Sequence, residues 1–163
     1  YPSLQNKVEL VFSDIEDAVL RGEVDAGLII HENRFTYADR GLFKAQDLGE
    51  FWEKGTGFPI PLGGIVIRRS LPQEVKELVN RLIAESVRFA FANPKSSASY
   101  VREHAQEMEE EVMYKHIELY VNAYSENLGE TGRKAVNYMF DEAERLGLVP
   151  KRTGSLFLQD HSL

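Results

Sequence analysis

The sequence predicts an α/β fold, and two observations support this class. Over the first seventy residues, short apolar runs rich in β-branched residues alternate with helical patterns. From Ser70 onward, apolar residues recur with the 3.6-residue period of amphipathic helices. A length of 163 residues is enough for one domain with a hydrophobic core, to which 9 Phe, 7 Tyr and one Trp contribute bulk.

The amino-terminal elements form a βαβ pattern. Residues 8–12 favour a strand, and Ser13 to Glu16 have the S-x-x-E spacing of a helix capping box. We expect the helix that follows to stop at Gly22. The next strand, 24–30, is continuously apolar over its last five residues, which is typical of a parallel strand buried on both faces.

The middle of the chain is less regular. We expect a short strand over 43–48 and a short helix over 50–54, followed by a segment rich in proline and glycine, 58–64, that excludes a helix. Residues 65–67, Ile-Val-Ile, predict a third strand. Beyond it the period predicts four helices, over 72–91, 97–104, 110–124 and 131–146.

The composition excludes several classes of partner and site. The 19 Lys and Arg against 26 Asp and Glu give a net charge of −7, which argues against a nucleic-acid backbone as partner. The absence of Cys excludes disulfides, thiolate zinc sites and iron–sulfur clusters. No apolar run approaches the ~20 residues that span a bilayer, and no zinc-protease, phosphate-loop or nucleophile-elbow motif occurs. We therefore expect no metal, no nucleic acid and no membrane insertion.

His31 is the first candidate for chemistry, because it follows the carboxyl end of an apolar strand, where open α/β sheets place their ligand sites. A histidine side chain, with an ordinary pKa of about 6.5, suits general acid–base catalysis near neutral pH; the alternative is a histidine that satisfies a loop hydrogen bond. Its neighbour Glu32 either orients the site or is a solvated carboxylate. Arg34 either holds a substrate carboxylate in a bidentate pair or forms a salt bridge within the domain.

Two further segments offer polar groups to a ligand. Asn122 lies near the end of an amphipathic helix, where Asn is a poor helix former, so it either makes a specific hydrogen bond or is exposed. The corner of residues 61–64, Pro-Leu-Gly-Gly, presents backbone groups around Leu62 and Gly63 without crowding side chains. This corner suits either a ligand or a chain crossing between two lobes.

Residues 22–37, which are GEVDAGLIIHENRFTY, closely resemble the 1,4-dihydroxy-6-naphthoate synthase family. The same resemblance is seen in residues 47–49, 52–53, 56–57, 61–63 and 104–107, in Pro59, and in residues 120–125, which are YVNAYS. The match extends from about residue 8 to residue 146. Its most specific part is I-I-H-E-x-R-F-T-Y, which a general solute-binding protein has no reason to carry.

This resemblance implies an enzyme of the futalosine route to menaquinone, which converts cyclic dehypoxanthine futalosine to 1,4-dihydroxy-6-naphthoate in the cytoplasm without a metal or organic cofactor. It implies the bilobal fold of type II periplasmic binding proteins, with the ligand between two α/β lobes. It also implies His31 as the general base. We expect six residues to bind the small carboxylate substrate: Ile30, Glu32, Arg34, Leu62, Gly63 and Asn122.

In this interpretation residues 1–64 are part of the second lobe and bear the His31 loop, and residues 65–149 hold a crossing strand and helices that pack on the first lobe. Residues 150–163 are a tail. The chain lacks an initiator Met and the amino-terminal segment of the family, so we expect it to be a carboxyl-terminal portion, inactive alone and either homo-oligomeric or poorly soluble. The alternative function is a non-catalytic binding module for a small carboxylate ligand.

Overall fold

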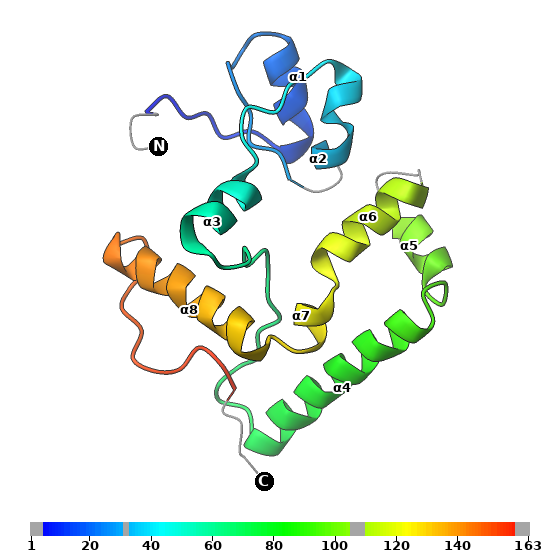
Figure 1. The fold of residues 1–163 in the computed structure, drawn as a ribbon, viewed down its shortest axis with the longest axis vertical. Coiled ribbons are helices and arrows are strands. Elements are labelled where there is room, and N and C mark those ends of the chain that lie inside the picture. Colours follow the sequence, from blue (N-terminus) through cyan, green and yellow to red (C-terminus); the bar gives the residue numbers. More distant parts are fainter. Residues whose placement is uncertain (1–4, 31–32, 105–109, 159–163) are drawn as a thin grey trace.

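A computed structural model describes residues 5–30, 33–104 and 110–158, and these residues form helices joined by extended segments (Figure 1). The elements in chain order are η1 Phe12–Asp14, α1 Ile15–Leu20, α2 Asn33–Thr36, η2 Tyr37–Arg40, α3 Leu48–Thr56, α4 Gln73–Ala92, α5 Ala98–His104, α6 Glu110–Tyr120, α7 Ala123–Glu126 and α8 Gly129–Arg145.

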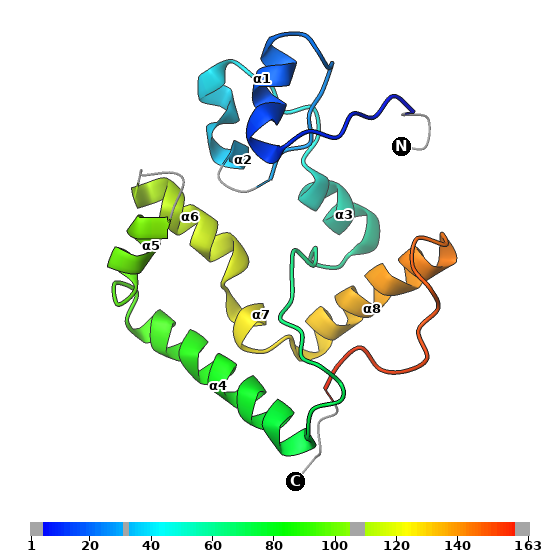
Figure 2. The same ribbon diagram turned by 180° about the vertical axis from the view of Figure 1, so that it is seen from behind.

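The helices α1 and α2 lie together at one end of the molecule, and the long helix α4 lies at the opposite end (Figures 1 and 2). α3 stands between these two regions, and α4 packs against α7. The segment after α8 returns toward the start of α4, where Arg69 Nη2 donates a hydrogen bond of 2.6 Å to the carbonyl oxygen of Ser155. The candidate site residues around α2 thus lie at the end of the molecule that α1 and α2 form.

Most predicted helices are confirmed, because their boundaries depend on local chemistry. α4 begins directly after Pro72, whose missing N–H costs nothing at a helix start. α1, α3 and α8 end next to Gly22, Gly57 and Gly147, which have φ values of 70°, 72° and 70°. Such left-handed backbone favours glycine, so the chain terminates these helices where the sequence indicates.

Two helix predictions are wrong in detail. No capping box forms at Ser13, whose hydroxyl donates to Asp14 Oδ1 at 3.0 Å while the backbone makes the short helix η1. The predicted helix 110–124 divides into α6 and α7, because Asn122 adopts extended backbone and caps α7. In both places a side-chain hydrogen bond to a near neighbour competes with the regular helix.

The predicted strands do not form a sheet within the described residues. Most of 8–12, 24–30 and 65–67 has no regular secondary structure, and 43–48 is an irregular segment leading into α3. The expected burial is also wrong, since Leu28 is 65% and Val66 is 92% exposed. A strand is stable when neighbouring backbone pairs with it and its apolar faces are covered. The described part of the chain offers these segments neither, so the α/β class is not shown here.

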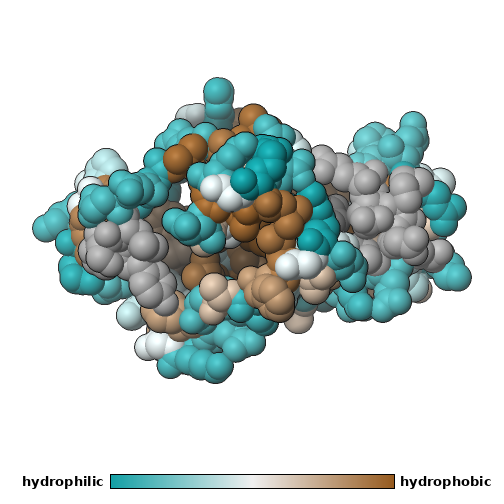
Figure 3. Space-filling model, turned by 90° about the horizontal axis from the view of Figure 1, so that it is seen from above, coloured by the Kyte–Doolittle hydropathy of each residue, from teal (hydrophilic) through white to brown (hydrophobic). Residues whose placement is uncertain are grey.

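The hydrophobic core is correspondingly small. Among the described residues only Ala18, Met113 and Ala135 are buried apolar side chains. An aromatic cluster joins α3 to α8, with the ring centroids of Trp52 and Tyr138 5.8 Å apart and those of Phe58 and Tyr138 5.6 Å apart. Many large apolar side chains remain exposed, and Figure 3 shows hydrophobic groups gathered near the middle of one face.

Candidate functional site

The segment that leads to His31 lies directly against α1. A Cβ atom on Gly27 would collide with Ile15 Cγ2 and would lie 3.2 Å from Val19 Cγ2, so only glycine permits this close approach. The chain then continues without regular secondary structure to Ile30, which is 48% exposed. His31 and Glu32 come next and lie outside the described residues, so their predicted roles stay predictions.

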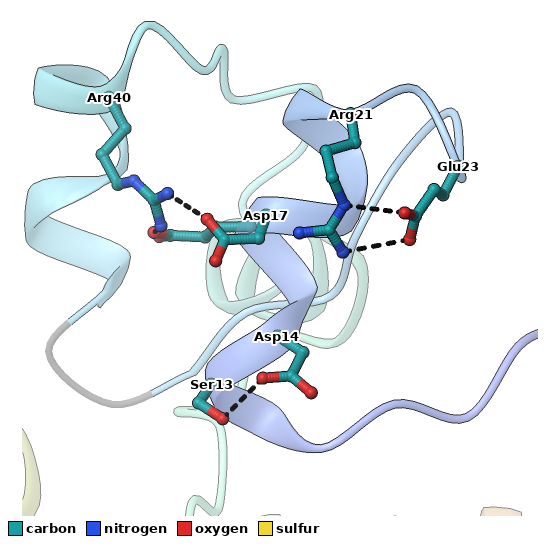
Figure 4. A network of polar contacts seen from close by, with 7 residues as sticks. Ser13, Asp14, Asp17, Arg21, Glu23 and Arg40 are labelled. Carbon is teal, nitrogen blue, oxygen red and sulfur yellow. Dashed lines mark hydrogen bonds and ion pairs between the residues drawn. The ribbon is translucent and has the colours of Figure 1, made fainter.

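The segment after them is tied back to the same helix by Arg40 (Figure 4). Arg40 Nη1 donates to Glu16 Oε2 at 2.7 Å, and Arg40 Nη2 donates to the carboxylate of Asp17. The Glu16 side chain is almost fully buried, whereas those of Asp17 and Arg40 are exposed. The hydrogen bond and charge of Arg40 lower the pKa of Asp17, and the two carboxylates raise the pKa of Arg40.

Arg34 is held at the start of this segment by one carboxylate and one ring. Its Nη2 lies 3.6 Å from Asp47 Oδ2, and its guanidinium carbon lies 5.4 Å from the ring centroid of Phe35. The predicted salt bridge within the domain is therefore present. At 3.6 Å and half-buried, the pair is long for a bidentate contact, so the guanidinium keeps donors that a ligand can take.

Asp47 is the N-cap of α3, and the sequence interpretation did not single it out. Its Oδ1 accepts hydrogen bonds from the backbone N–H groups of Gly49 at 2.9 Å and Glu50 at 3.1 Å. The hydrogen bond from Glu50 contributes most to a lowered pKa of Asp47, and the charge of Arg34 adds to it. Asp three residues before Glu at the start of a helix is a known N-terminal pattern, so the sequence did contain this signal.

The remaining candidates occupy different surroundings. Leu62 is 43% exposed, and a Cβ atom on Gly63 would meet nothing within 4 Å, so the corner is open. Asn122 is engaged in capping α7, since its side chain accepts from the N–H of Tyr124 at 3.0 Å and donates to the carbonyl of Leu119 at 3.2 Å. The specific hydrogen-bond role expected for Asn122 is thus present as a helix cap, and its contact with the substrate stays a prediction.

The structure therefore does not bring all candidates into one place. Arg34 on α2 belongs to the α1–α2 end of the molecule, whereas Asn122 precedes α7, which lies well apart from α2 (Figure 1). Glu16 and Arg40, the residues that organise the α1–α2 end, were missed by sequence interpretation. These two residues are 24 positions apart in the sequence, so no local sequence pattern indicates that they pair.

Other features of the described residues do not add a site. No group of three or more His, Asp or Glu in the described ranges is placed to hold a metal ion. No helix in this part of the chain is both long and apolar enough to cross a membrane. A depression of about 380 Å³ is lined by α4 residues alone, which makes it an open helix surface: Glu74, Val75, Glu77, Leu78 and Arg81.

Comparison with known proteins places the chain in a family. A family model described as menaquinone biosynthesis matches residues 2–145. The chain belongs to this menaquinone-biosynthesis family. A 1,4-dihydroxy-6-naphthoate synthase of Thermus thermophilus is 44% identical to it over 151 residues, covering 93% of this chain and 56% of the relative. A synthase of the same name from Streptomyces coelicolor is 48% identical over 143 residues, covering 88% and 51%.

A solved structure supports the same family assignment. A crystal structure of a protein from Archaeoglobus fulgidus matches this chain with a TM-score of 0.81 and 39% identity, covering 87% of this chain and 54% of that one. The predicted resemblance to the synthases is thereby confirmed. The chain spans about half the length of the curated relatives it matches.

Proposed function

We propose that this chain is part of a 1,4-dihydroxy-6-naphthoate synthase, a carbon–carbon lyase that converts cyclic dehypoxanthine futalosine to 1,4-dihydroxy-6-naphthoate during menaquinone biosynthesis. The observation that carries this proposal is its identity of 44% and 48% with two relatives of that name. The family model that includes residues 22–37 supports the same pathway.

His31 is the general base in this proposal. A neutral imidazole accepts a proton near pH 7, and removal of a hydroxyl or C–H proton from the substrate starts cleavage of the carbon–carbon bond. The product is aromatic, so aromatisation supplies driving force for the cleavage. Two contacts support this proposal: the segment before His31 is held against α1 at Gly27, and the segment after it is held there by Arg40.

Arg34 binds the substrate carboxylate in the same proposal. Its guanidinium is held near Asp47 and the ring of Phe35. Because it lies 3.6 Å from the Asp47 carboxylate, it can still form a closer, charge-assisted pair with a substrate carboxylate. The exposed side chains of Ile30 and Leu62 supply apolar surface of the kind that covers an aromatic ring.

The test is turnover by the protein as its gene encodes it. Purified protein is incubated with cyclic dehypoxanthine futalosine, and 1,4-dihydroxy-6-naphthoate is measured by liquid chromatography with mass detection. We expect product to accumulate with enzyme concentration. Calorimetric binding of the substrate without any product would instead identify a non-catalytic module for a small carboxylate ligand.

A further inference from the structure

The helices α2 and η2 lie in the chain between two contacts with the same helix, α1. On the entering side, Gly27 touches the Ile15 and Val19 side chains so closely that a Cβ is excluded. On the leaving side, Arg40 pairs with Glu16 and Asp17. α2 and η2 are therefore restrained from two directions.

Burial makes the second anchor specific. The side chain of Glu16 is 3% exposed, and a buried carboxylate is costly unless a cation and hydrogen bonds compensate it. Arg40 supplies that compensation at Glu16 Oε2, while Glu16 Oε1 has no hydrogen-bond partner among the described residues. Moving η2 away from α1 would remove the cation that compensates this buried carboxylate. The pair therefore disfavours other placements of η2.

The shape of the contact also restricts rotation. Arg40 uses two different nitrogens for two carboxylates that are adjacent in sequence on α1. A planar guanidinium held at two points fixes both the distance and the angle between the elements. A lysine ammonium at this position would keep attraction without fixing the angle.

We propose that Glu16 and Arg40 are positioning residues that set the placement of α2 and η2, and through α2 the alignment of Arg34 with the substrate. This inference rests on the proposed function. Neither residue touches the substrate; they act by holding α2 and η2. Because a misplacement of about 1 Å can cost a rate factor of about 10², we expect their loss to reduce kcat.

The variants are Arg40→Gln, Arg40→Lys and Glu16→Gln, made in the protein as its gene encodes it. We expect Arg40→Gln to lower kcat by about 10- to 100-fold. Arg40→Lys recovers part of this loss, because the ammonium still neutralises Glu16. The control is Arg21→Gln, since Arg21 is an exposed arginine next to α1 that pairs only locally, with Glu23 at 2.7 Å (Figure 4).

Two measurements distinguish the possible results. Steady-state kinetics give kcat and KM, and hydrogen–deuterium exchange reports the amides of residues 33–40 without requiring turnover. We expect faster exchange there in Arg40→Gln and wild-type exchange in Arg21→Gln. If wild-type protein shows no turnover, the proposed function fails while the exchange result still tests the positioning. Wild-type exchange in Arg40→Gln overturns the inference, and so does a kcat of Arg40→Gln within twofold of wild type. A loss of kcat in Arg40→Gln that is equally large in Arg40→Lys also overturns it.

Discussion

Replacement of Asp47 tests whether α3 and Arg34 are organised as the structure shows. Asp47 makes two kinds of contact: hydrogen bonds from the backbone N–H groups of Gly49 and Glu50, and ion pairs with Arg34 at 3.6 Å and Lys44 at 3.9 Å. Asp47→Asn retains a good capping side chain without the charge. Asp47→Ala removes both, so the two variants separate the cap from the charge.

The expected magnitudes follow from these contacts. Loss of an N-cap costs about 1 kcal/mol, and the partly exposed ion pairs contribute about 0.5 kcal/mol in total. Asp47→Ala should therefore lower the free energy of unfolding by about 1.5 kcal/mol and Asp47→Asn by about 0.5 kcal/mol. With a urea slope of about 2 kcal/mol per M, the unfolding midpoints fall by about 0.75 M and 0.25 M.

The assay is urea unfolding of the protein as its gene encodes it, followed by tryptophan fluorescence at pH 7, with Asp39→Ala at an exposed position as the control. The pKa of Asp47 is lowered below its ordinary 3.8 in the folded state. Its contribution is therefore present above pH 3.8 and lost as the pH falls through the lowered value, so the variants should approach wild type in acid. Equal midpoints for Asp47→Ala and Asp47→Asn, or a wild-type midpoint for Asp47→Ala, would refute the capping role.

Three further predictions follow from other contacts. Arg34→Lys should raise KM more than it lowers kcat, because the bidentate geometry is lost; an unchanged KM in steady-state kinetics would leave Arg34 with its structural role alone. Gly27→Ala should destabilise the protein by about 1–3 kcal/mol in urea unfolding, whereas Gly64→Ala, where a Cβ meets nothing within 4 Å, should be nearly neutral. The isolated 163-residue chain should have no synthase activity and should associate or precipitate, because apolar side chains such as that of Val66 are exposed; an active monomer of 18.6 kDa in light scattering would contradict this.

The helices were predictable because their determinants are local. Each signal lies within the helix that it specifies or within a few residues of its end. Examples are the 3.6-residue apolar period, Pro72 at the start of one helix and Gly147 at the end of another. The breaks were less predictable, since Asn122 ends one helix and caps the next by hydrogen bonds that depend on the conformation of its neighbours.

The strands and the site depend on contacts that a local pattern does not contain. The β-branched run at 65–67 predicted a strand, but none forms among the described residues, because sheet formation requires a partner strand from elsewhere. The segment around His31 was identified by its resemblance to a family, and the chain belongs to that family. The Glu16–Arg40 pair escaped prediction, because two charged residues 24 positions apart resemble ordinary surface charge until the fold places one of them in the interior.

The proposed role of His31 as the base of a carbon–carbon lyase is tested most directly by turnover of cyclic dehypoxanthine futalosine by His31→Ala in the protein as its gene encodes it. The matched control is His104→Ala, since His104 is an exposed histidine on α5 whose ring stacks on Tyr100 with centroids 4.2 Å apart. We predict that His31→Ala lowers kcat by about 10² to 10⁴ with an unchanged circular dichroism spectrum, while His104→Ala keeps wild-type turnover. Turnover by His31→Ala within a few-fold of wild type would contradict the account.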